Sequence, residues 1–204
     1  MSKTVTQRET LGGADGRGVV MRVVGCGNAW AGDDSAGLEI VRRLRVRGSC
    51  ECELLERPHA GVELMEVLRD VERVLFIDAV SSGAPAGTLH LVPLPSVSIV
   101  PRTISSISSH GWGLAETLRL MAALRHRIPR LALLGVEIEA ALPGTPRSAA
   151  VESAIQAVLE RFAAFEEFLA LEGQWDWATP RRFMPGDALC GLAKGEVPTG
   201  KGGF

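Results

Sequence analysis

Three side chains that could bind a metal ion lie far apart in this chain. Asp34 follows a glycine-containing loop at the start of an amphipathic stretch, Asp78 closes the apolar run 74–77, and His110 follows a serine-rich loop. Carboxylate oxygen and imidazole nitrogen are ligands that divalent metals accept. In open α/β sheets, ligands gather at the carboxyl ends of the strands. The sequence therefore predicts that Asp34, Asp78 and His110 converge on one divalent metal ion at such an edge.

Each of these residues also has a structural role open to it. Asp33 and Asp34 are adjacent at an expected helix start, where aspartate is a favoured N-cap, so one of the two is expected to be that cap. Asp78 could instead cap a loop, because a buried carboxylate needs hydrogen bonds, a charged partner or a cation. A single histidine before a helix, such as His110, is more often structural. The predicted site therefore rests on all three acting together.

Other kinds of chemistry have weaker support. The chain has no Gly-x-Ser-x-Gly nucleophile elbow and no His-Glu-x-x-His zinc motif. The pair Gly25-x-Gly27 lacks the third glycine of a dinucleotide fingerprint, and there is no Walker lysine, so phosphate binding is disfavoured. The remaining histidines have no neighbouring acid or glycine and are treated as background: His59, His90 and His126. Catalysis would have to use metal-assisted water or a carboxylate base.

Apolar runs alternate with helical stretches from residue 20 to about residue 170, and this alternation predicts the scaffold. The runs 74–77 and 131–134 are uniformly apolar, as in strands buried on both faces. The pattern indicates an α/β fold: a three-layer sandwich with a mostly parallel, twisted sheet of about five strands and helices on both faces. We expect strands at 19–25, 51–56, 73–78, 88–92 and 130–136, helices at 35–46, 61–70, 112–125 and 148–171, and a turn at 82–87 joining two neighbouring strands.

Length and composition are typical of one globular domain. We expect a domain at 19–172 between a disordered N-terminal extension, 1–18, and an irregular C-terminal tail, 173–204. The net charge of −2 gives no indication of nucleic-acid binding, and no apolar stretch is long enough to span a membrane. The N-terminal residues lack an apolar signal core, so we expect a cytoplasmic protein with its four cysteines reduced.

Taken together, these segments resemble the nickel–iron hydrogenase maturation endopeptidases. The resemblance covers about residues 20–170 and consists of motifs in the family's order. These are Val24-Gly25-Cys26-Gly27-Asn28 with Gly32-Asp33-Asp34-x-x-Gly37, Ala60-Gly61-Val62-Glu63-Leu64, Ile77-Asp78-Ala79-Val80, Ser109-His110-x-x-Gly113-Leu114 and the strand end Leu134-Gly135-Val136-Glu137. The chain departs from the family at Glu56-Arg57-Pro58-His59, where many members have Asp-Gly-Gly-Thr. The resemblance implies a phosphorylase/hydrolase-like fold.

The resemblance also implies a function. Such a protein would be an endopeptidase that removes the C-terminal extension of a nickel-loaded [NiFe] hydrogenase large-subunit precursor. Asp34, Asp78 and His110 would be its catalytic residues and would bind nickel, which would arrive with the precursor. The expected partner is that precursor, and the protein is expected to be a monomer.

Two other functions stay open from the sequence. The same three ligands would serve a non-catalytic, nickel-dependent hydrogenase-binding assembly factor. A peptidyl-tRNA hydrolase also begins with a strand that leads into Gly-x-Gly-Asn. That enzyme needs a histidine shortly after the asparagine and a basic surface, whereas this chain has Asp33-Asp34 and a negative net charge.

Overall fold

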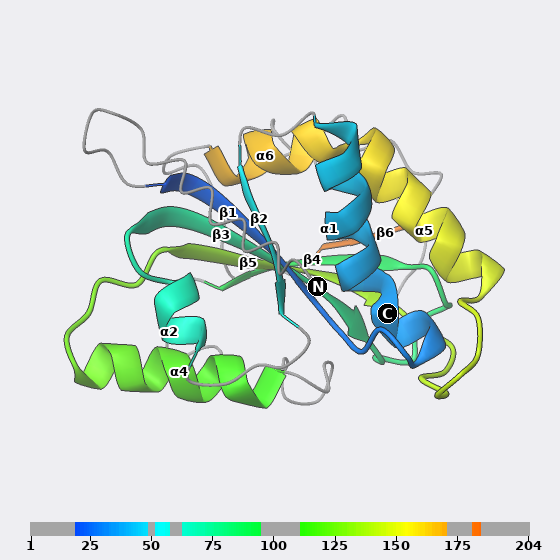
Figure 1. Ribbon diagram of the computed structural model, residues 1–204, viewed down its shortest axis with the longest axis horizontal. Coiled ribbons are helices and arrows are strands. Elements are labelled where there is room, and N and C mark those ends of the chain that lie inside the picture. Colours follow the sequence, from blue (N-terminus) through cyan, green and yellow to red (C-terminus); the bar gives the residue numbers. More distant parts are fainter. Residues whose placement is uncertain (1–18, 49–51, 58–62, 95–110, 171–180, 185–204) are drawn as a thin grey trace, which may run out of the picture.

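A six-stranded sheet runs through the middle of the molecule, with helices on both faces (Figure 1). The computed structural model describes residues 19–48, 52–57, 63–94, 111–170 and 181–184. The strands are β1 Val19–Cys26, β2 Glu53–Arg57, β3 Val71–Val80, β4 Leu89–Leu94, β5 Arg130–Glu137 and β6 Arg181–Phe183. Their order is β2-β1-β3-β5-β4-β6, in which β2, β1, β3 and β5 are parallel and β4 is antiparallel to both of its neighbours. The α/β class with a mostly parallel sheet is confirmed.

The helices divide between the two faces of the sheet (Figure 1). One face carries the helices α1 Ala36–Arg47, α5 Ala149–Glu160 and α6 Phe162–Ala170, and the other carries α2 Leu64–Val67 and α4 Gly111–Ala123. A short 3₁₀ helix, η1 Gly32–Ser35, lies between β1 and α1. Successive strand residues alternate between two apolar cores, as the period-two geometry of a strand requires. In β3, Leu75 and Ile77 pack under α1 and α5, whereas Val74 and Phe76 pack toward α2 and α4.

The connection after β3 differs from the sequence expectation. Residues 82–87 do form a tight connection, with Gly83 and Gly87 in the left-handed backbone region. However, β3 and β4 are not neighbours, because β5 inserts between them and pairs with both. A turn motif shows that the chain reverses but not which strand fills the space beside it. The expected turn between neighbouring strands is therefore wrong.

Two other elements differ from the expected pattern. The helix expected at 148–171 is interrupted at Arg161, whose backbone N–H bonds the carbonyl of Val158 in a tighter 3₁₀-like turn. The apolar stripe continues across this break, so periodicity alone does not reveal it. The strand β6 lies within the segment 173–204, which was expected to be irregular, and pairs with β4. The rest of that tail and the extension 1–18 lie outside the described residues.

The cysteines only partly follow the expectation of reduced thiols. Cys26 is a free, buried thiol. Cys52 is disulfide-bonded, so the expectation is wrong for this residue. Cys50 and Cys190 lie outside the described residues.

None of the helices in the described ranges is both long enough and apolar enough to cross a bilayer.

Candidate functional site

Two glycines bring the start of α1 directly onto the sheet. A Cβ atom on Gly25 would collide with the backbone carbonyl of Gly37, and one on Gly37 would collide with the carbonyls of Cys26 and Ile77. Only glycine permits this approach, because any side chain would push the helix away. The first turn of α1 therefore sits against the ends of β1 and β3, which holds η1 and its aspartates at the carboxyl edge of the sheet.

Asp34 is buried in η1 and is part of a tightly bonded loop. Its Oδ2 accepts a hydrogen bond from the backbone N–H of Asn28 at 3.1 Å, and the same N–H lies 3.2 Å from the Asp34 carbonyl. The side chain of Asn28 in turn accepts from the N–H of Trp30 at 3.0 Å. These bonds fix the loop 27–31, and the Asn28 side chain ties its backbone together.

Asp33 has a structural role, but not the one expected. It caps no helix: neither η1 nor α1 has a side-chain cap. Instead its carboxylate accepts from the backbone N–H groups of Ser148, at 2.6 Å, and Glu139, at 3.3 Å. Asp33 thus joins the loop after β1 to the segment between β5 and α5. The cap assignment is wrong because these long-range partners compete successfully for the carboxylate.

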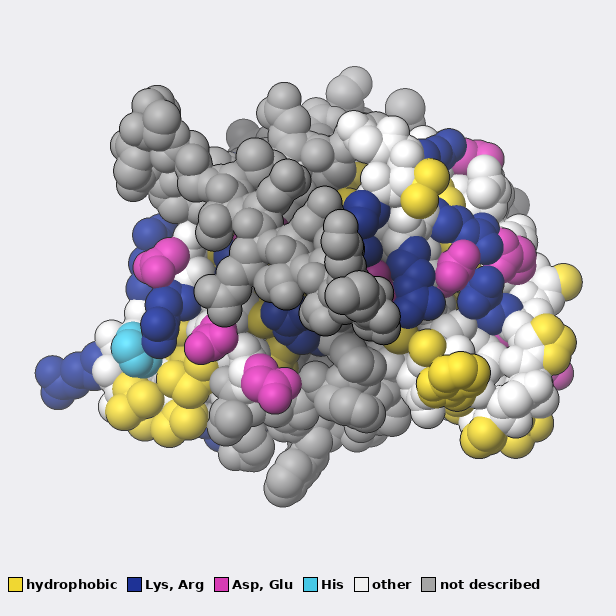
Figure 2. Space-filling model, viewed as in Figure 1, with side chains coloured by type: hydrophobic (Ala, Val, Ile, Leu, Met, Phe, Trp, Pro, Cys, Tyr) yellow, Lys and Arg dark blue, Asp and Glu magenta, His cyan; other side chains and the backbone are white. Residues whose placement is uncertain are grey.

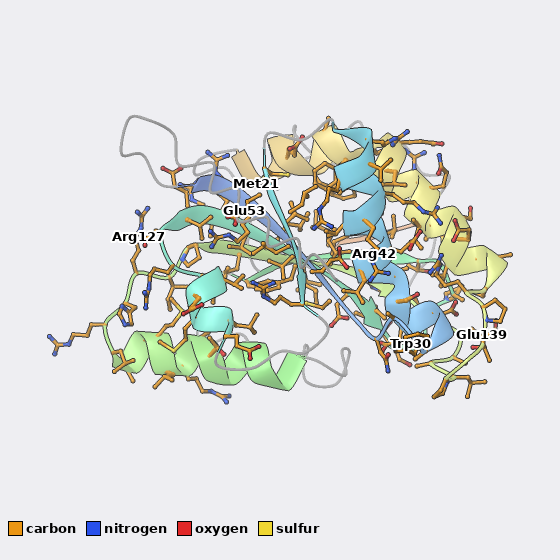
Figure 3. The ribbon with its side chains drawn as sticks, viewed as in Figure 1. Met21, Trp30, Arg42, Glu53, Arg127 and Glu139 are labelled. Atoms are coloured by element: carbon orange, nitrogen blue, oxygen red, sulfur yellow. The ribbon has the colours of Figure 1, made fainter. Side chains whose placement is uncertain are left out.

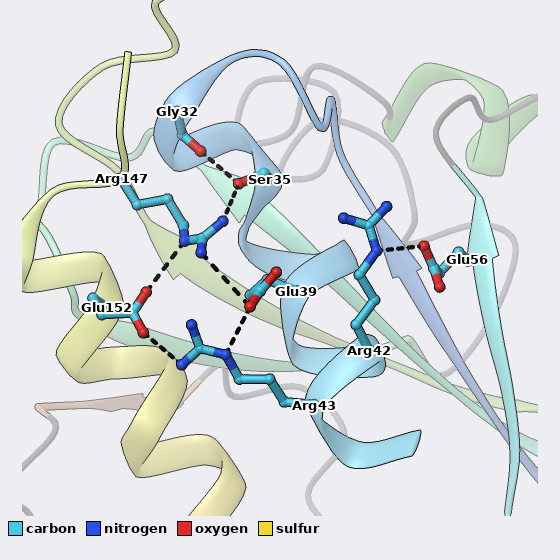
Figure 4. A network of polar contacts seen from close by, with 8 residues as sticks. All are labelled: Gly32, Ser35, Glu39, Arg42, Arg43, Glu56, Arg147 and Glu152. Atoms are coloured by element: carbon cyan, nitrogen blue, oxygen red, sulfur yellow. Dashed lines mark hydrogen bonds and ion pairs between the residues drawn. The ribbon is translucent and has the colours of Figure 1, made fainter. Parts of the chain in front are cut away.

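An ion-pair network behind η1 strengthens this connection (Figure 4). The Ser35 hydroxyl donates to the Gly32 carbonyl at 2.6 Å and accepts from Arg147 at 3.0 Å. Arg147 also pairs with Glu152 at 3.2 Å and Glu39 at 3.6 Å. The network holds η1 against the start of α5.

The arginines of α1 are part of the same bracing. Arg43 pairs with Glu39 at 2.7 Å and with Glu152 at 2.5 Å, and its hydrogen bond is the main reason that the pKa of Glu152 is lowered. Arg42 and Arg45 both pair with Glu56 of β2. These three arginines of α1 are therefore engaged in intramolecular contacts.

Asp78 is buried near the carboxyl end of β3, on the sheet face that carries α2 and α4. Its Oδ1 accepts from the N–H of Ala79 at 2.9 Å. Burial raises the pKa of the neighbouring Cys26 thiol, the negative charge of Asp78 raises it further, and Arg57 partly opposes the rise. The ends of β1, β2 and β3 thus place a carboxylate, a neutral thiol and a guanidinium in one electrostatic neighbourhood.

Two of the three predicted ligands lie at the same edge. Asp78 lies within β3, and Asp34 lies in η1, which follows the adjacent parallel strand β1; Gly25 pairs with Ile77, and η1 contacts β3. His110 lies outside the described residues, and α4 begins at the next residue, Gly111. Within the described part of the chain, no group of three His, Cys, Asp or Glu side chains is arranged to hold a metal. The full three-residue site remains a prediction.

A buried pair at the same edge was missed in the sequence. His90 of β4 lies 2.8 Å from Glu137 of β5, and both are buried. Glu137 also accepts from the N–H groups of Ser82 and Gly83, at 2.6 and 2.9 Å, and from the Ser82 hydroxyl at 2.8 Å. Glu137 therefore fixes the loop that leaves β3 shortly after Asp78. Its position at the end of an apolar strand was the available signal, but its partner lies 47 residues away.

The fold and the acidic carboxyl edge define an α/β enzyme domain, and the comparisons with known proteins identify its family. The chain belongs to the hydrogenase maturation protease family, whose model matches residues 38–164. That match includes Asp78 and His110 and begins just after Asp34. It decides against the peptidyl-tRNA hydrolase alternative.

Individual relatives agree with this family. Hydrogenase expression/formation protein HupD of Thiocapsa roseopersicina is 31% identical over 119 residues, which span 56% of this chain and 52% of that protein. The hydrogenase maturating endopeptidase HybD from E. coli is 26% identical, with a TM-score of 0.61 over 72% of this chain and 93% of HybD. The [NiFe] hydrogenase maturation protease HybD from Thermococcus kodakarensis, at 21% identity and a TM-score of 0.58, covers 72% of this chain and 98% of its own and supports the fold alone.

Proposed function

We propose that this protein is the endopeptidase that removes the C-terminal extension from a nickel-loaded [NiFe] hydrogenase large-subunit precursor. The observation that supports the proposal is that Asp34 and Asp78 are each buried at the carboxyl edge of a sheet whose fold is that of HybD from E. coli. Burying two carboxylates at one edge is costly unless they are hydrogen-bonded or share a cation. The hydrogen bonds to Asp34 and Asp78 offset part of that cost, and a bound metal ion would offset more of it during the reaction.

In this proposal Asp34, Asp78 and His110 complete the coordination of the nickel that the precursor brings. Two carboxylates and one imidazole leave coordination positions open for ligands from the precursor. The backbone bonds to Asp34 and Asp78 hold their carboxylates in place before the precursor arrives. Such preorganisation reduces the cost of assembling the site.

The reaction is a hydrolysis. Water adds to the carbonyl carbon of the scissile peptide bond, the carbon–nitrogen bond breaks, and the leaving amine takes up a proton. A nickel ion held against this bond would polarise the carbonyl or lower the pKa of the attacking water. Oriented binding contributes as well, because it fixes the bond relative to the metal. The cytoplasmic location and the monomeric state remain predictions from the sequence.

The test is incubation of the purified protein with the nickel-loaded precursor, followed by mass measurement of the products. We expect one cut, with a mass loss equal to the C-terminal extension, and no cut in the nickel-free precursor. Binding without any mass loss would contradict the protease and support the non-catalytic assembly factor. Cutting of both precursor forms at the same rate would contradict the role of nickel.

A further inference from the structure

An exposed apolar patch lies beside the candidate site and takes no part in the packing of the two cores. The side chain of Trp30 is 82% exposed and that of Leu142 is 57% exposed. Leu142 and the exposed Pro143 belong to the turn whose Gly144 bonds the backbone of Trp30, and we call Trp30, Leu142 and Pro143 the Trp30 patch. Figure 3 places Trp30 at the same end of the molecule as Glu139, and Figure 2 shows hydrophobic side chains at the surface there.

Two loops that are distant in the sequence are bonded together beneath this patch. The N–H of Gly144 donates to the carbonyl of Trp30 at 2.7 Å, and the N–H of Trp30 donates to the Asn28 side chain at 3.0 Å. Gly32 lies so close to Thr145 that a Cβ atom on it would be only 2.6 Å from the Thr145 hydroxyl. The backbone under Trp30 is therefore held on both sides, while the indole projects into solvent. A rigid aromatic side chain that needs little ordering on binding is typical of an interface anchor.

The position of the patch ties it to the predicted chemistry. The backbone N–H of Asn28 bonds both the carboxylate and the carbonyl of Asp34, so Trp30 lies within the closed loop that Asp34 completes. A polypeptide whose scissile peptide bond lies at Asp34 and Asp78 would have to pass close to this loop. The loop that carries Trp30 is thus bonded directly to Asp34, at the carboxyl edge of the sheet.

The size of the patch decides among its possible occupants. An indole and a leucyl side chain offer about 300 Å² of apolar surface, given roughly 150–250 Å² for an aromatic side chain. A stable interface between two folded proteins needs about 800 Å² from each partner. A second copy of this chain would need much more surface than the patch supplies. A single apolar side chain of an extended segment is a much better match.

We propose that the Trp30 patch is the docking point for an apolar side chain in the carboxyl-terminal segment of the precursor. This inference rests on the proposed function and specifies how the substrate is held. Trp30 contacts the substrate near the bond that is cut but does not take part in the bond-breaking step. It therefore contributes to binding and to specificity.

The test compares cleavage kinetics of the Trp30→Ala and Trp30→Leu variants with the nickel-loaded precursor. We expect Trp30→Ala to raise KM about tenfold with kcat unchanged within about twofold, as for a truncated hot-spot side chain. Trp30→Leu should recover much of the loss, because it keeps an apolar side chain. The control is Leu124→Ala, since Leu124 is 54% exposed at the end of α4 and away from the patch. It should leave KM unchanged.

A double-mutant cycle identifies the partner side chain. Each apolar residue of the precursor's extension is changed to serine and assayed with wild-type protein and with Trp30→Ala. One such change should raise KM with the wild type but cause little further increase with Trp30→Ala, because both remove the same contact. Strictly additive effects at every position would overturn the proposal.

The outcomes separate this proposal from the proposed function. If the wild type cleaves but Trp30→Ala has an unchanged KM, the docking role is refuted and the protease stands. If the wild type binds the precursor without cleaving it, the protease is refuted, and the affinity of Trp30→Ala for the precursor decides the docking role. If the wild type neither binds nor cleaves, both are refuted.

Discussion

Buried charge occurs both where the parallel strands begin, which we call the amino edge, and where they end, the carboxyl edge. The two edges use this charge differently. Near the amino edge, the guanidinium of Arg22 bonds Glu53 at 2.7 Å and the carbonyls of Val67 and Arg69. These contacts connect β1 to β2, to the end of α2 and to the residues just after α2. At the carboxyl edge, Asp34 and Asp78 are buried at the ends of two adjacent strands. The amino edge uses one cation for structure, whereas the carboxyl edge gathers acidic groups of the kind that bind metals.

The difference shows that the shape of the surface does not locate the site. A cavity of about 520 Å³ lies at the amino edge, lined by residues that include Leu68, Asp70, Val71, Met121 and Arg127. Its charged residues lie on an open surface, and the family motifs contribute none of its lining. The chemistry indicated by the sequence lies at the opposite edge. Buried carboxylates on adjacent strand ends are the better guide to function here.

The largest expected effect is on precursor processing, in a comparison of one aspartate variant from each edge. Asp78→Asn should lower processing of the nickel-loaded precursor at least about 100-fold, because changes even beyond the direct ligands of a metal cost 10–100-fold. Asp70→Asn, at the amino-edge cavity, should leave processing unchanged, and asparagine tolerates the left-handed backbone of this residue. The readout is the mass of the large subunit. Asp34→Ala and His110→Ala should also stop processing in a folded protein, and normal trimming by all of these variants would refute the site.

Variants of Glu137 test how much the buried His90–Glu137 pair at the carboxyl edge contributes to the free energy of unfolding. Glu137→Ala leaves His90 and two backbone N–H groups of the 82–83 loop without their acceptor, so the free energy of unfolding should fall by about 3–5 kcal/mol. Glu137→Gln should cost much less, since an amide oxygen can still accept from that loop. Urea unfolding measures both. Equal stability of Glu137→Ala and the wild type would show that the pair is not a structural anchor.

Variants of Asp33 test whether this aspartate has a structural role while its neighbour Asp34 has the chemical one. Asp33→Ala removes the acceptor of the Ser148 and Glu139 N–H groups, and we expect the free energy of unfolding to fall by about 1–3 kcal/mol. Asp33→Asn should be milder, because one carbonyl oxygen remains. Both variants should still process the precursor at temperatures where they are folded. Loss of processing by a fully folded Asp33→Asn would transfer the chemical role from Asp34 to Asp33.

The smallest effect concerns the ion-pair network behind η1. The hydrogen bond from Arg43 lowers the pKa of Glu152 in the folded state. The contribution of this ion pair to the free energy of unfolding is therefore fully present above the pKa of Glu152 in the unfolded chain, about 4.3. It is lost as the pH falls through the lower pKa of Glu152 in the folded protein. Because Glu152 is 43% exposed, Glu152→Gln should cost only about 0.2–1 kcal/mol at pH 7. Thermal melts at pH 7 and pH 3 should show a larger difference between Glu152→Gln and the wild type at pH 7 than at pH 3.

The sequence predicts the framework well because its signals are local. The uniformly apolar run 74–77 indicates a strand buried on both faces, and that strand occurs as part of β3. What the sequence misses depends on long-range contacts. The insertion of β5 beside β3, the pairing of His90 with Glu137 and the bonds from Asp33 to Ser148 all join segments far apart in the chain. No local pattern around His90 or Asp33 specifies those partners.

The coordination of the precursor's nickel tests the central claim most directly. X-ray absorption at the nickel edge would be recorded for the precursor alone and for its rapidly frozen complex with this protein. We expect additional oxygen and nitrogen ligands in the complex, fewer of them with Asp78→Ala and an unchanged number with Asp33→Ala. A nickel spectrum that does not change when the protein binds would contradict the shared site.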